Sequence, residues 1–390
     1  MKLPLVVYSH LRWNSVYQRP HHLAARFARE RTVVFVEEPL FPETEAPDSW
    51  DLDWASEDLV VARPRVAVEG AGFPWTNLRF ERMTSALLRA LGIRHHIAWL
   101  YTPLATRLAL SVGPTSVAYD CMDDLSSFLG APPEMALREA HLLRAADVVF
   151  TGGASLYRAK RALHPNVHCV PSSVDATHFR TARDPRAASD PVPAAPHPRL
   201  GFYGVLDERF DCELVDGVAA ARPDWQIMLV GPVAKIDPAS LPRRPNLHYL
   251  GQRPYEELPA HLAHWDVCLL PFARNEATKF ISPTKTLEYM AAEKPIVSTT
   301  IRDVVEPYGH VVEIADDAAG FVAACEKLLA EDAQARARRA AAMRRLVART
   351  SWDATARAMS SELERGRRAV RPTSARSALP ASALREDGAR

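Results

Sequence analysis

The segment formed by residues 265–300, WDVCLLPFARNEATKFISPTKTLEYMAAEKPIVSTT, constrains the fold more than any other part of the chain. It opens with an apolar run, residues 267–272, which is too short for a helix and predicts a buried strand. The pair Ser282-Pro283 then predicts a helix start, with Ser as N-cap and Pro at the first helical position. Helical spacing continues over residues 284–293, and residues 296–300 predict a second strand. This order predicts a strand–helix–strand unit of a parallel sheet.

Two charged residues near the start of that expected helix point to an anion. Lys285 falls at the third helical position, where a capping box would place Glu or Gln. A cation there opposes the helix dipole at a cost of about 0.3–1 kcal/mol, and a bound anion would reverse that penalty. Glu288 follows three residues later on the same face, so phosphate on Lys285 and ribose hydroxyls on Glu288 would suit a phosphorylated sugar. A solvated lysine with Glu288 as its ion-pair partner fits the same spacing.

Residues 266–299 resemble the carboxyl-terminal signature of nucleotide-sugar glycosyltransferases with the GT-B fold, the large retaining group often called family four. In that group a strand ending in Pro leads to a loop and a helix carrying Glu, followed by EYLAAGKPVV, and residues 288–297 here read EYMAAEKPIV. The resemblance is closest to bacterial members that build teichuronic-acid-like and other surface polysaccharides. It implies an α/β chain with two doubly wound Rossmann-like domains facing across a cleft.

Three positions depart from the family pattern. The first of the family's usual two glutamates would fall on Phe280, and its usual Gly is Glu293, so only the second acidic role carries over, to Glu288. An Arg and a Lys grip the diphosphate in the wider family, but Val205 stands where that Arg is often found. The resemblance therefore implies a donor site that we assign to eight residues: Gly204, Arg209, Gly231, Arg253, Ser282, Thr284, Lys285 and Glu288.

The amino-terminal segment predicts a second ligand-binding loop. Residues 5–8 predict a strand, Pro20 opens a helix, and residues 32–36 predict the next strand, which is the order of a doubly wound domain. The phrase SHLRW…YQRPHHLA also resembles the opening of the same glycosyltransferase subgroup. His10 is either a catalytic candidate or a structural histidine at a strand end. The candidates for acceptor binding in this loop are Arg12, Trp13 and Arg19.

Carboxylates follow another expected strand, residues 116–119. Asp120, Asp123 and Asp124 could bind a metal or act as acid and base, but Asp is also favoured in caps and turns. We take Asp120, directly at the strand end, as the second catalytic candidate. We take Asp123 and Asp124 as capping residues.

No metal site is predicted. Asp51 and Asp53 form a D-x-D, but they lie in an acidic segment, residues 43–58, that we expect to be a loop or excursion. The metal-binding D-x-D of the other major transferase fold is therefore poorly supported. We expect no cofactor besides the substrates.

Length and composition exclude several classes of protein. The 390 residues suffice for two domains, and 48 Lys+Arg against 47 Asp+Glu give no overall attraction to nucleic acid. Five scattered cysteines without a C-x-x-C pair indicate reduced thiols, not a disulfide framework or a zinc site. No apolar run reaches the ~18 residues of a membrane span, and no segment resembles a signal peptide. The absence of G-x-G-x-x-G argues against a dinucleotide oxidoreductase.

The pattern along the chain predicts the domain boundaries. We expect one domain over residues 1–180 and a second over 199–351. The resemblance implies that the first binds the acceptor, that the second binds the nucleotide sugar, and that a helix at 352–370 returns to the first domain. Residues 181–198, rich in Ala, Pro and Asp, are the expected linker, and residues 371–390 the expected disordered tail.

The resemblance implies that the chain is a glycosyltransferase acting in surface polysaccharide or glycoconjugate biosynthesis. The implied donor is a UDP-, GDP- or dTDP-sugar, and the acceptor a saccharide, a lipid-linked sugar or a small molecule. Transfer is expected to be retaining and metal-independent, in the cytoplasm. A sugar-nucleotide epimerase, a phosphorylase and a non-catalytic nucleotide-sugar-binding protein stay open as alternatives. The arginine-studded residues 333–349 fit either a solvated helix face or peripheral contact with the inner membrane face.

Overall fold

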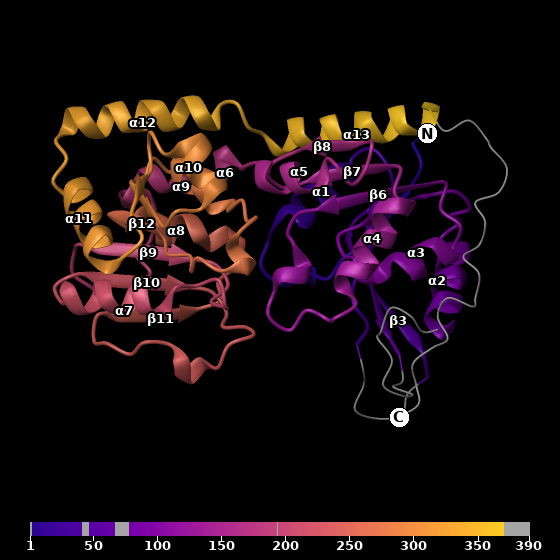
Figure 1. Cartoon of the computed structure of the whole chain (residues 1–390), viewed down its shortest axis with the longest axis horizontal. Coiled ribbons are helices and arrows are strands. Elements are labelled where there is room, and N and C mark those ends of the chain that lie inside the picture. Colours follow the sequence, from indigo (N-terminus) through magenta and orange to yellow (C-terminus); the bar gives the residue numbers. More distant parts are fainter. Residues whose placement is uncertain (1, 41–46, 67–77, 193, 370–390) are drawn as a thin grey trace.

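The computed structural model describes residues 2–40, 47–66, 78–192 and 194–369, which form two α/β domains lying side by side (Figure 1). The tail expected at residues 371–390 lies outside these ranges. The first domain contains an eight-stranded sheet in the order β3-β4-β2-β1-β5-β6-β7-β8. Its strands are β1 (Leu5–Tyr8), β2 (Val33–Val36), β3 (Ser49–Ser56), β4 (Leu59–Arg65), β5 (Ile97–Leu100), β6 (Ser116–Cys121), β7 (Val148–Thr151) and β8 (Val167–Cys169).

The second domain contains a six-stranded parallel sheet in the order β11-β10-β9-β12-β13-β14. Its strands are β9 (Arg199–Tyr203), β10 (Gln226–Val230), β11 (Leu247–Gly251), β12 (Val267–Leu270), β13 (Ile296–Ser298) and β14 (Glu313–Ile314). The chain runs outward from β9 in one direction and from β12 in the other. The topological switch point therefore lies between these two strands, where doubly wound sheets bind ligands.

Helices cover both faces of each sheet, which explains why central strands such as LVVY in β1 are apolar at every position. Val6 and Tyr8 pack into one core of the first domain, and Leu5 and Val7 into the other. The helices are α1 (Arg19–Phe27), α2 (Leu78–Ala90), α3 (Thr106–Ser111), α4 (Met135–Ala145), α5 (Ala154–Lys160), α6 (Ala176–Arg180), α7 (Cys212–Ala221), α8 (Leu258–Ala263), α9 (Lys285–Ala291), α10 (Arg302–Tyr308), α11 (Ala318–Leu329), α12 (Ala333–Val347) and α13 (Trp352–Ala369).

The carboxyl-terminal helices connect the two domains. Helix α12 runs along the second domain, and α13 continues along the first domain, where it packs against α1 and β7 (Figure 1). Trp352, Met359 and Leu363 of α13 are buried in the same core as Leu5 and Val7. Within the described residues, none of the helices is long and apolar enough to cross a bilayer.

The arginine-rich stretch forms α12, and its arginines differ in their partners. Arg344 pairs with Glu293, and Arg339 pairs with Glu331. Arg338 and Arg345 are exposed, and no ion pair involves either of them among the residues that the structure describes. Both interpretations of this face, solvated or lipid-contacting, fit the arrangement.

Two expectations about secondary structure are wrong. The segment expected as a loop contains β3, which pairs antiparallel with β4 and places Trp50, Leu52 and Trp54 on one face, while residues 43–46 lie outside the described ranges. Helix α9 begins at Lys285, with Thr284 in the N-cap position and no side-chain cap, so Ser282 does not cap it.

Glu293, which stands where the family pattern has Gly, adopts a left-handed conformation with φ of 59°. This conformation costs a non-Gly residue about 1–2 kcal/mol. Its carboxylate accepts ion pairs from Arg183 and Arg344, each at 2.8 Å. Because Arg183 lies in the segment joining the domains and Arg344 lies in α12, these pairs fasten both segments to the end of α9 and offset the strain.

Direct contacts also join the domains. Asp303 of α10 accepts a hydrogen bond from the backbone N–H of Ser155 at 3.0 Å and one from its hydroxyl. Arg158 of α5 pairs with Glu306 of α10 at 2.9 Å. A Cβ on Gly153 would overlap the Asp303 carboxylate, so glycine permits this close approach.

Candidate functional site

A pocket lies between the two domains, at the carboxyl ends of the strands on either side of the β9/β12 switch point. The first domain contributes Val16, Tyr17, Gln18, Arg19, Met122, Asp123 and Ser172 to its lining. All eight residues predicted for donor binding line the pocket from the second domain: Gly204, Arg209, Gly231, Arg253, Ser282, Thr284, Lys285 and Glu288. The structure therefore brings together residues that span 85 positions of sequence, from 204 to 288.

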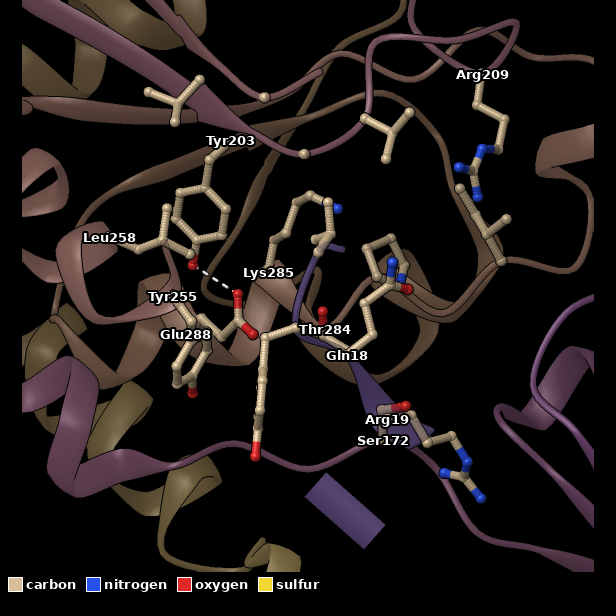
Figure 2. A pocket seen from close by; sticks show the side chains of 18 of the residues that line it. Gln18, Arg19, Ser172, Tyr203, Arg209, Tyr255, Leu258, Thr284, Lys285 and Glu288 are labelled. Carbon is tan, nitrogen blue, oxygen red and sulfur yellow. Dashed lines mark hydrogen bonds between the residues drawn. The ribbon is translucent and has the colours of Figure 1, made fainter. Parts of the chain in front are cut away.

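Lys285 and Glu288 project from α9 into this pocket (Figure 2). The hydroxyl of Tyr203, the last residue of β9, donates a hydrogen bond to Oε2 of Glu288 at 2.6 Å. Burial raises the pKa of Glu288, while the Tyr203 hydrogen bond and the charge of Lys285 oppose that shift. Tyr203, which the sequence did not single out, thus fixes the orientation of the carboxylate.

Lys285 is a cation without a counter-ion at hydrogen-bond distance. No hydrogen bond or ion pair involves its ammonium among the residues that the structure describes. Its Nζ lies 5.6 Å from the ring centre of Phe202 and 5.9 Å from that of Phe272. Burial lowers the pKa of Lys285, and the charge of Glu288 opposes this shift. The alternative of a solvated lysine paired with Glu288 does not describe this geometry.

Two further cations face the same side of the pocket. Asp207 holds the Arg209 guanidinium, with Nε 3.0 Å from Oδ1 and Nη2 2.6 Å from Oδ2. Arg209 also lies over the ring of Phe128 from the first domain, 4.9 Å from its centre. Arg253 is exposed at the pocket edge, and no ion pair involves it among the described residues. This concentration of positive charge suits a ligand with several phosphate oxygens.

Two glycines allow the turns of the second domain to approach Lys285. Gly204 and Gly231 have φ of 148° and 146°, which side chains rarely adopt. A Cβ on Gly231 would overlap the carbonyl oxygen of Gly204. A Cβ on Gly204 would lie 2.9 Å from Nζ of Lys285. The backbone conformation therefore favours glycine at both positions, and the absence of a Cβ on Gly204 leaves room for the end of the Lys285 side chain.

We expect Gly231→Ala to lower the free energy of unfolding by about 2–4 kcal/mol, because it combines backbone strain with a backbone overlap. Gly113→Ala is the matched control, since Gly113 has φ of 66° but nothing within 4 Å of an added Cβ, and it should cost only about 1 kcal/mol. Urea denaturation of both variants checks this difference. Equal losses for the two variants would contradict the account of the turn.

The structure corrects the catalytic assignment of Asp120. Strand β6 extends to Cys121, so Asp120 lies within the strand and is fully buried. Its carboxylate accepts three hydrogen bonds at 2.8–3.1 Å from the guanidinium of Arg19, which is also buried and donates to the carbonyl of Val170. In Figure 2 the Arg19 side chain extends away from Lys285 and Glu288. This buried ion pair argues against catalysis by Asp120 and acceptor binding by Arg19.

Arg12 and Trp13 do not line the pocket. Arg12 pairs with Glu37 at 3.3 Å and donates to the backbone carbonyl of Glu38. The Trp13 ring packs against Phe35, with ring centres 5.1 Å apart, and its backbone N–H donates to Glu37 at 2.7 Å. Both residues therefore stabilise the loop after β1, and neither is placed to contact an acceptor in this pocket.

His10 follows β1 and lies near the cations of the second domain, although it is not part of the pocket lining. Its Nδ1 is buried and has no hydrogen-bond partner among the residues that the structure describes. Burial, together with the positive charges of Lys235 and Arg209, lowers the pKa of His10 to about 4. The imidazole is therefore neutral at neutral pH, and each of its ring nitrogens can take part in one hydrogen bond.

Asp123 is the pocket carboxylate that the sequence analysis missed. It lines the pocket from the loop after β6, and no hydrogen bond or ion pair of its carboxylate occurs among the described residues. Burial raises the pKa of Asp123 to about 6, while the charges of Arg209 and Lys285 oppose the shift. Asp124 has the turn role expected for both, since it accepts hydrogen bonds from Ser126 and Ser127 at 3.1 and 2.7 Å. Asp123 and Asp124 are adjacent and identical residues, so the sequence does not distinguish the pocket residue from the turn residue.

The acidic side chains do not form an evident metal centre. Asp51 and Asp53 lie on β3, where they approach Arg63 at 3.8 and 3.5 Å. Within the described part of the chain, no group of three or more His, Cys, Asp or Glu side chains is arranged so as to hold a metal ion.

Sequence comparison relates the second domain to a known family. Residues 197–331 match the family described as Glycosyl transferases group 1. The Bacillus subtilis (strain 168) protein TuaH, provisionally named as a teichuronic acid biosynthesis glycosyltransferase, is 30% identical over 161 residues. This match covers 40% of the chain and 40% of TuaH, so it spans less than half of that relative.

Solved structures share the fold of nearly the whole chain. Sucrose-phosphate synthase from Thermosynechococcus elongatus has a TM-score of 0.68 at 16% identity, covering 95% of this chain and all of that one. An E. coli structure described as trehalose-6-phosphate bound with UDP-2-fluoro glucose has a TM-score of 0.68 at 12% identity, covering 92% of this chain and 98% of that one. The trehalose-phosphate synthase of Burkholderia xenovorans, in complex with glucose-6-phosphate, has a TM-score of 0.67 at 13% identity, covering 93% of this chain and 100% of that one. At these identities the likeness shows the fold alone.

Proposed function

We propose that this chain, a group 1 glycosyltransferase of the GT-B fold by its second domain and its architecture, transfers a sugar from a nucleoside-diphosphate donor to a saccharide acceptor in polysaccharide biosynthesis. The observation that carries the proposal is Lys285, a half-buried cation that faces the interdomain pocket beside Glu288 and has no hydrogen bond or ion pair within the described residues. A cation held in this way stabilises the pocket only when an anion binds beside it.

The second-domain side of the pocket suits the donor. Lys285 and Arg209 would bind the diphosphate, and the Glu288 carboxylate, held by Tyr203, would accept hydrogen bonds from ribose hydroxyls. During transfer negative charge develops on the leaving diphosphate. Positive groups already fixed in the pocket would stabilise that charge without reorganisation.

A thermal-shift panel of UDP, GDP, dTDP and their sugars tests donor binding. Ligand that binds the folded state at 100 times its Kd adds about 2.7 kcal/mol of stability. We expect one nucleobase to raise the melting temperature clearly more than the others. No rise with any nucleotide would contradict the proposal.

We propose that transfer retains the anomeric configuration. The bond from the anomeric carbon to the leaving phosphate breaks, a bond to the acceptor oxygen forms on the same face, and the acceptor proton passes to the leaving phosphate. Retention is motivated by the family resemblance and by the pairing of Asp120 with Arg19, which withdraws one candidate base of an inverting displacement. Proton NMR of the first-formed product gives the anomer directly, and an inverted product would overturn this mechanism while leaving the donor site intact.

We also propose that turnover needs no metal ion. The motive is the cationic donor side of the pocket, where Lys285 and Arg209 can neutralise the leaving diphosphate in place of a divalent cation. Activity in excess chelator should stay within about twofold of the untreated enzyme. Complete loss of activity that Mg²⁺ or Mn²⁺ restores would contradict this proposal.

A further inference from the structure

We infer that the acceptor is an uncharged saccharide and not a sugar phosphate, and that Asp123 sets this preference by accepting hydrogen bonds from acceptor hydroxyls. The inference rests on the proposed function and names the substrate class for the first-domain side of the same pocket. It follows from how the charges of that side are paired.

The two sides of the pocket carry opposite charge. On the second-domain side, Lys285, Arg209 and Arg253 are cationic, and Glu288 is the carboxylate. On the first-domain side, the charged residues of the lining are Arg19 and Asp123. Arg19 is paired with Asp120 and Arg209 with Asp207, so the cations of the lining without an ion pair among the described residues, Lys285 and Arg253, both belong to the second domain.

Arginines that could bind an acceptor phosphate are committed to buried carboxylates. Arg19 is 1% exposed and pairs with Asp120. Arg12 pairs with Glu37, which is also 1% exposed and also lies 3.4 Å from Arg63. A phosphate would have to displace these carboxylates and leave them buried without a partner, which is strongly unfavourable.

A lysine beside the neighbouring Asp124 is committed as well. Lys160 pairs with Glu139 at 2.7 Å and lies 3.7 Å from Asp124. Tyr119 donates to the other oxygen of Glu139 at 2.9 Å. This network stabilises the loop that contains Asp123 and Asp124. Because the charge of Lys160 is already compensated by Glu139, Lys160 is unavailable to a ligand.

Asp123 is the charged group of the first-domain lining that has no partner within the described residues. Ligands that satisfy a carboxylate are hydrogen-bond donors such as sugar hydroxyls, whereas a phosphate placed beside it would be repelled. Gln18 and Ser172, which are neutral and line the same side, can exchange further hydrogen bonds with hydroxyls (Figure 2). Together, Asp123, Gln18 and Ser172 therefore favour a neutral ligand that carries several hydroxyl groups.

The assignment to the acceptor follows from position. Asp123 lines the pocket from the first domain, and Arg209 and Lys285 line it from the second. A donor diphosphate bound by those cations would keep away from the carboxylate, so the acceptor occupies the space beside Asp123. The Burkholderia xenovorans enzyme of similar fold was solved in complex with glucose-6-phosphate, so a sugar phosphate is the appropriate comparison for this assignment.

The test compares glucose, galactose and N-acetylglucosamine with their 6-phosphates, using the full chain saturated with the nucleoside diphosphate that stabilises it best. Titration calorimetry gives Kd for each sugar, and nucleoside diphosphate release from the donor gives kcat/KM. We expect at least one neutral sugar to bind and react at least 10-fold better than its phosphate. Asp123→Asn should raise the acceptor KM about 10- to 100-fold and leave the donor KM within twofold. It should also lower the ratio of kcat/KM for the neutral sugar over that for its phosphate.

The matched control is Glu134→Gln, which removes a first-domain carboxylate outside the pocket and should change neither the acceptor KM nor the ratio. Two results would overturn the inference. One is binding of the sugar phosphates that equals or exceeds that of the neutral sugars, and the other is a ratio of kcat/KM for neutral sugar over sugar phosphate that is the same in Asp123→Asn as in the wild type. Stabilisation of the wild type by no nucleotide would instead count against the proposed function. The two failures are therefore distinguishable.

Discussion

Lys285→Ala is expected to weaken nucleoside-diphosphate binding by about 1–3 kcal/mol, which is roughly 5- to 150-fold in Kd. The reason is that the Lys285 ammonium has no hydrogen bond or ion pair within the described structure, so a bound phosphate gains a charged hydrogen bond without breaking one. Isothermal titration calorimetry of the wild type and the variant with the preferred nucleotide measures the change.

Lys279→Ala is the matched control for this substitution. Lys279 lies six positions earlier in sequence, is exposed, and pairs with Glu276 at 3.3 Å. Its loss should leave Kd within twofold, because surface ion pairs contribute little. Unchanged affinity of Lys285→Ala for every nucleotide that binds the wild type would show that the diphosphate is held elsewhere.

His10→Ala is expected to reduce kcat about 10- to 1000-fold, the usual range for one positioned polar or acid–base group. Because burial and neighbouring cations lower the pKa of His10 to about 4, the imidazole is neutral from neutral pH down to about pH 5. We therefore expect it to hydrogen-bond the donor sugar or the acceptor, and the part of the rate that depends on it should fall only as the pH approaches 4.

The exposed His95 provides the control, and His95→Ala should leave kcat within twofold. Initial rates under donor and acceptor saturation, from pH 4.5 to 8, compare the two variants with the wild type. A loss of less than threefold in His10→Ala would assign His10 a structural role. A far larger loss accompanied by an inverted product would identify it as the base of an inverting displacement.

The convergence of the second-domain residues on one pocket could be predicted from the sequence because these residues follow strands of one parallel sheet. Gly204 follows β9 directly, Gly231 follows β10, and Lys285 begins the helix after β12. Parallel strands present their carboxyl ends at one edge, so residues placed after each strand converge there. Spacing along the chain was therefore enough to bring these groups together.

The first-domain side could not be predicted because its chemistry depends on pairs distant in sequence. Arg19 and Asp120 are 101 positions apart, and no local pattern shows that their side chains meet. Strand β6 extends two residues beyond its expected end, so Asp120 lies within the strand and Asp123 becomes the pocket carboxylate. Because the predicted end of the strand was two residues too early, Asp120 was chosen as the site residue, although Asp123 is the one that lines the pocket.

Strand β3 was missed for a related reason. Its sequence SWDLDWAS alternates, but the acidic residues and the exposed Trp54 resemble a loop when read without the partner strand. Pairing with β4 brings Arg63 within 4 Å of both Asp51 and Asp53. Cross-strand pairing of this kind stabilises an edge strand that composition alone does not predict.

Mass spectrometry of a complete reaction shows whether the protein transfers a sugar. The full chain is incubated with the nucleotide sugar that stabilises it best and with a panel of neutral saccharides, and both products are quantified. The account predicts a saccharide heavier by one sugar residue, formed in equal amount to the released nucleoside diphosphate, with little product from Lys285→Ala at donor concentrations near the wild-type KM. Tight nucleotide binding without transfer to any acceptor would contradict it and identify the chain as a nucleotide-sugar-binding protein.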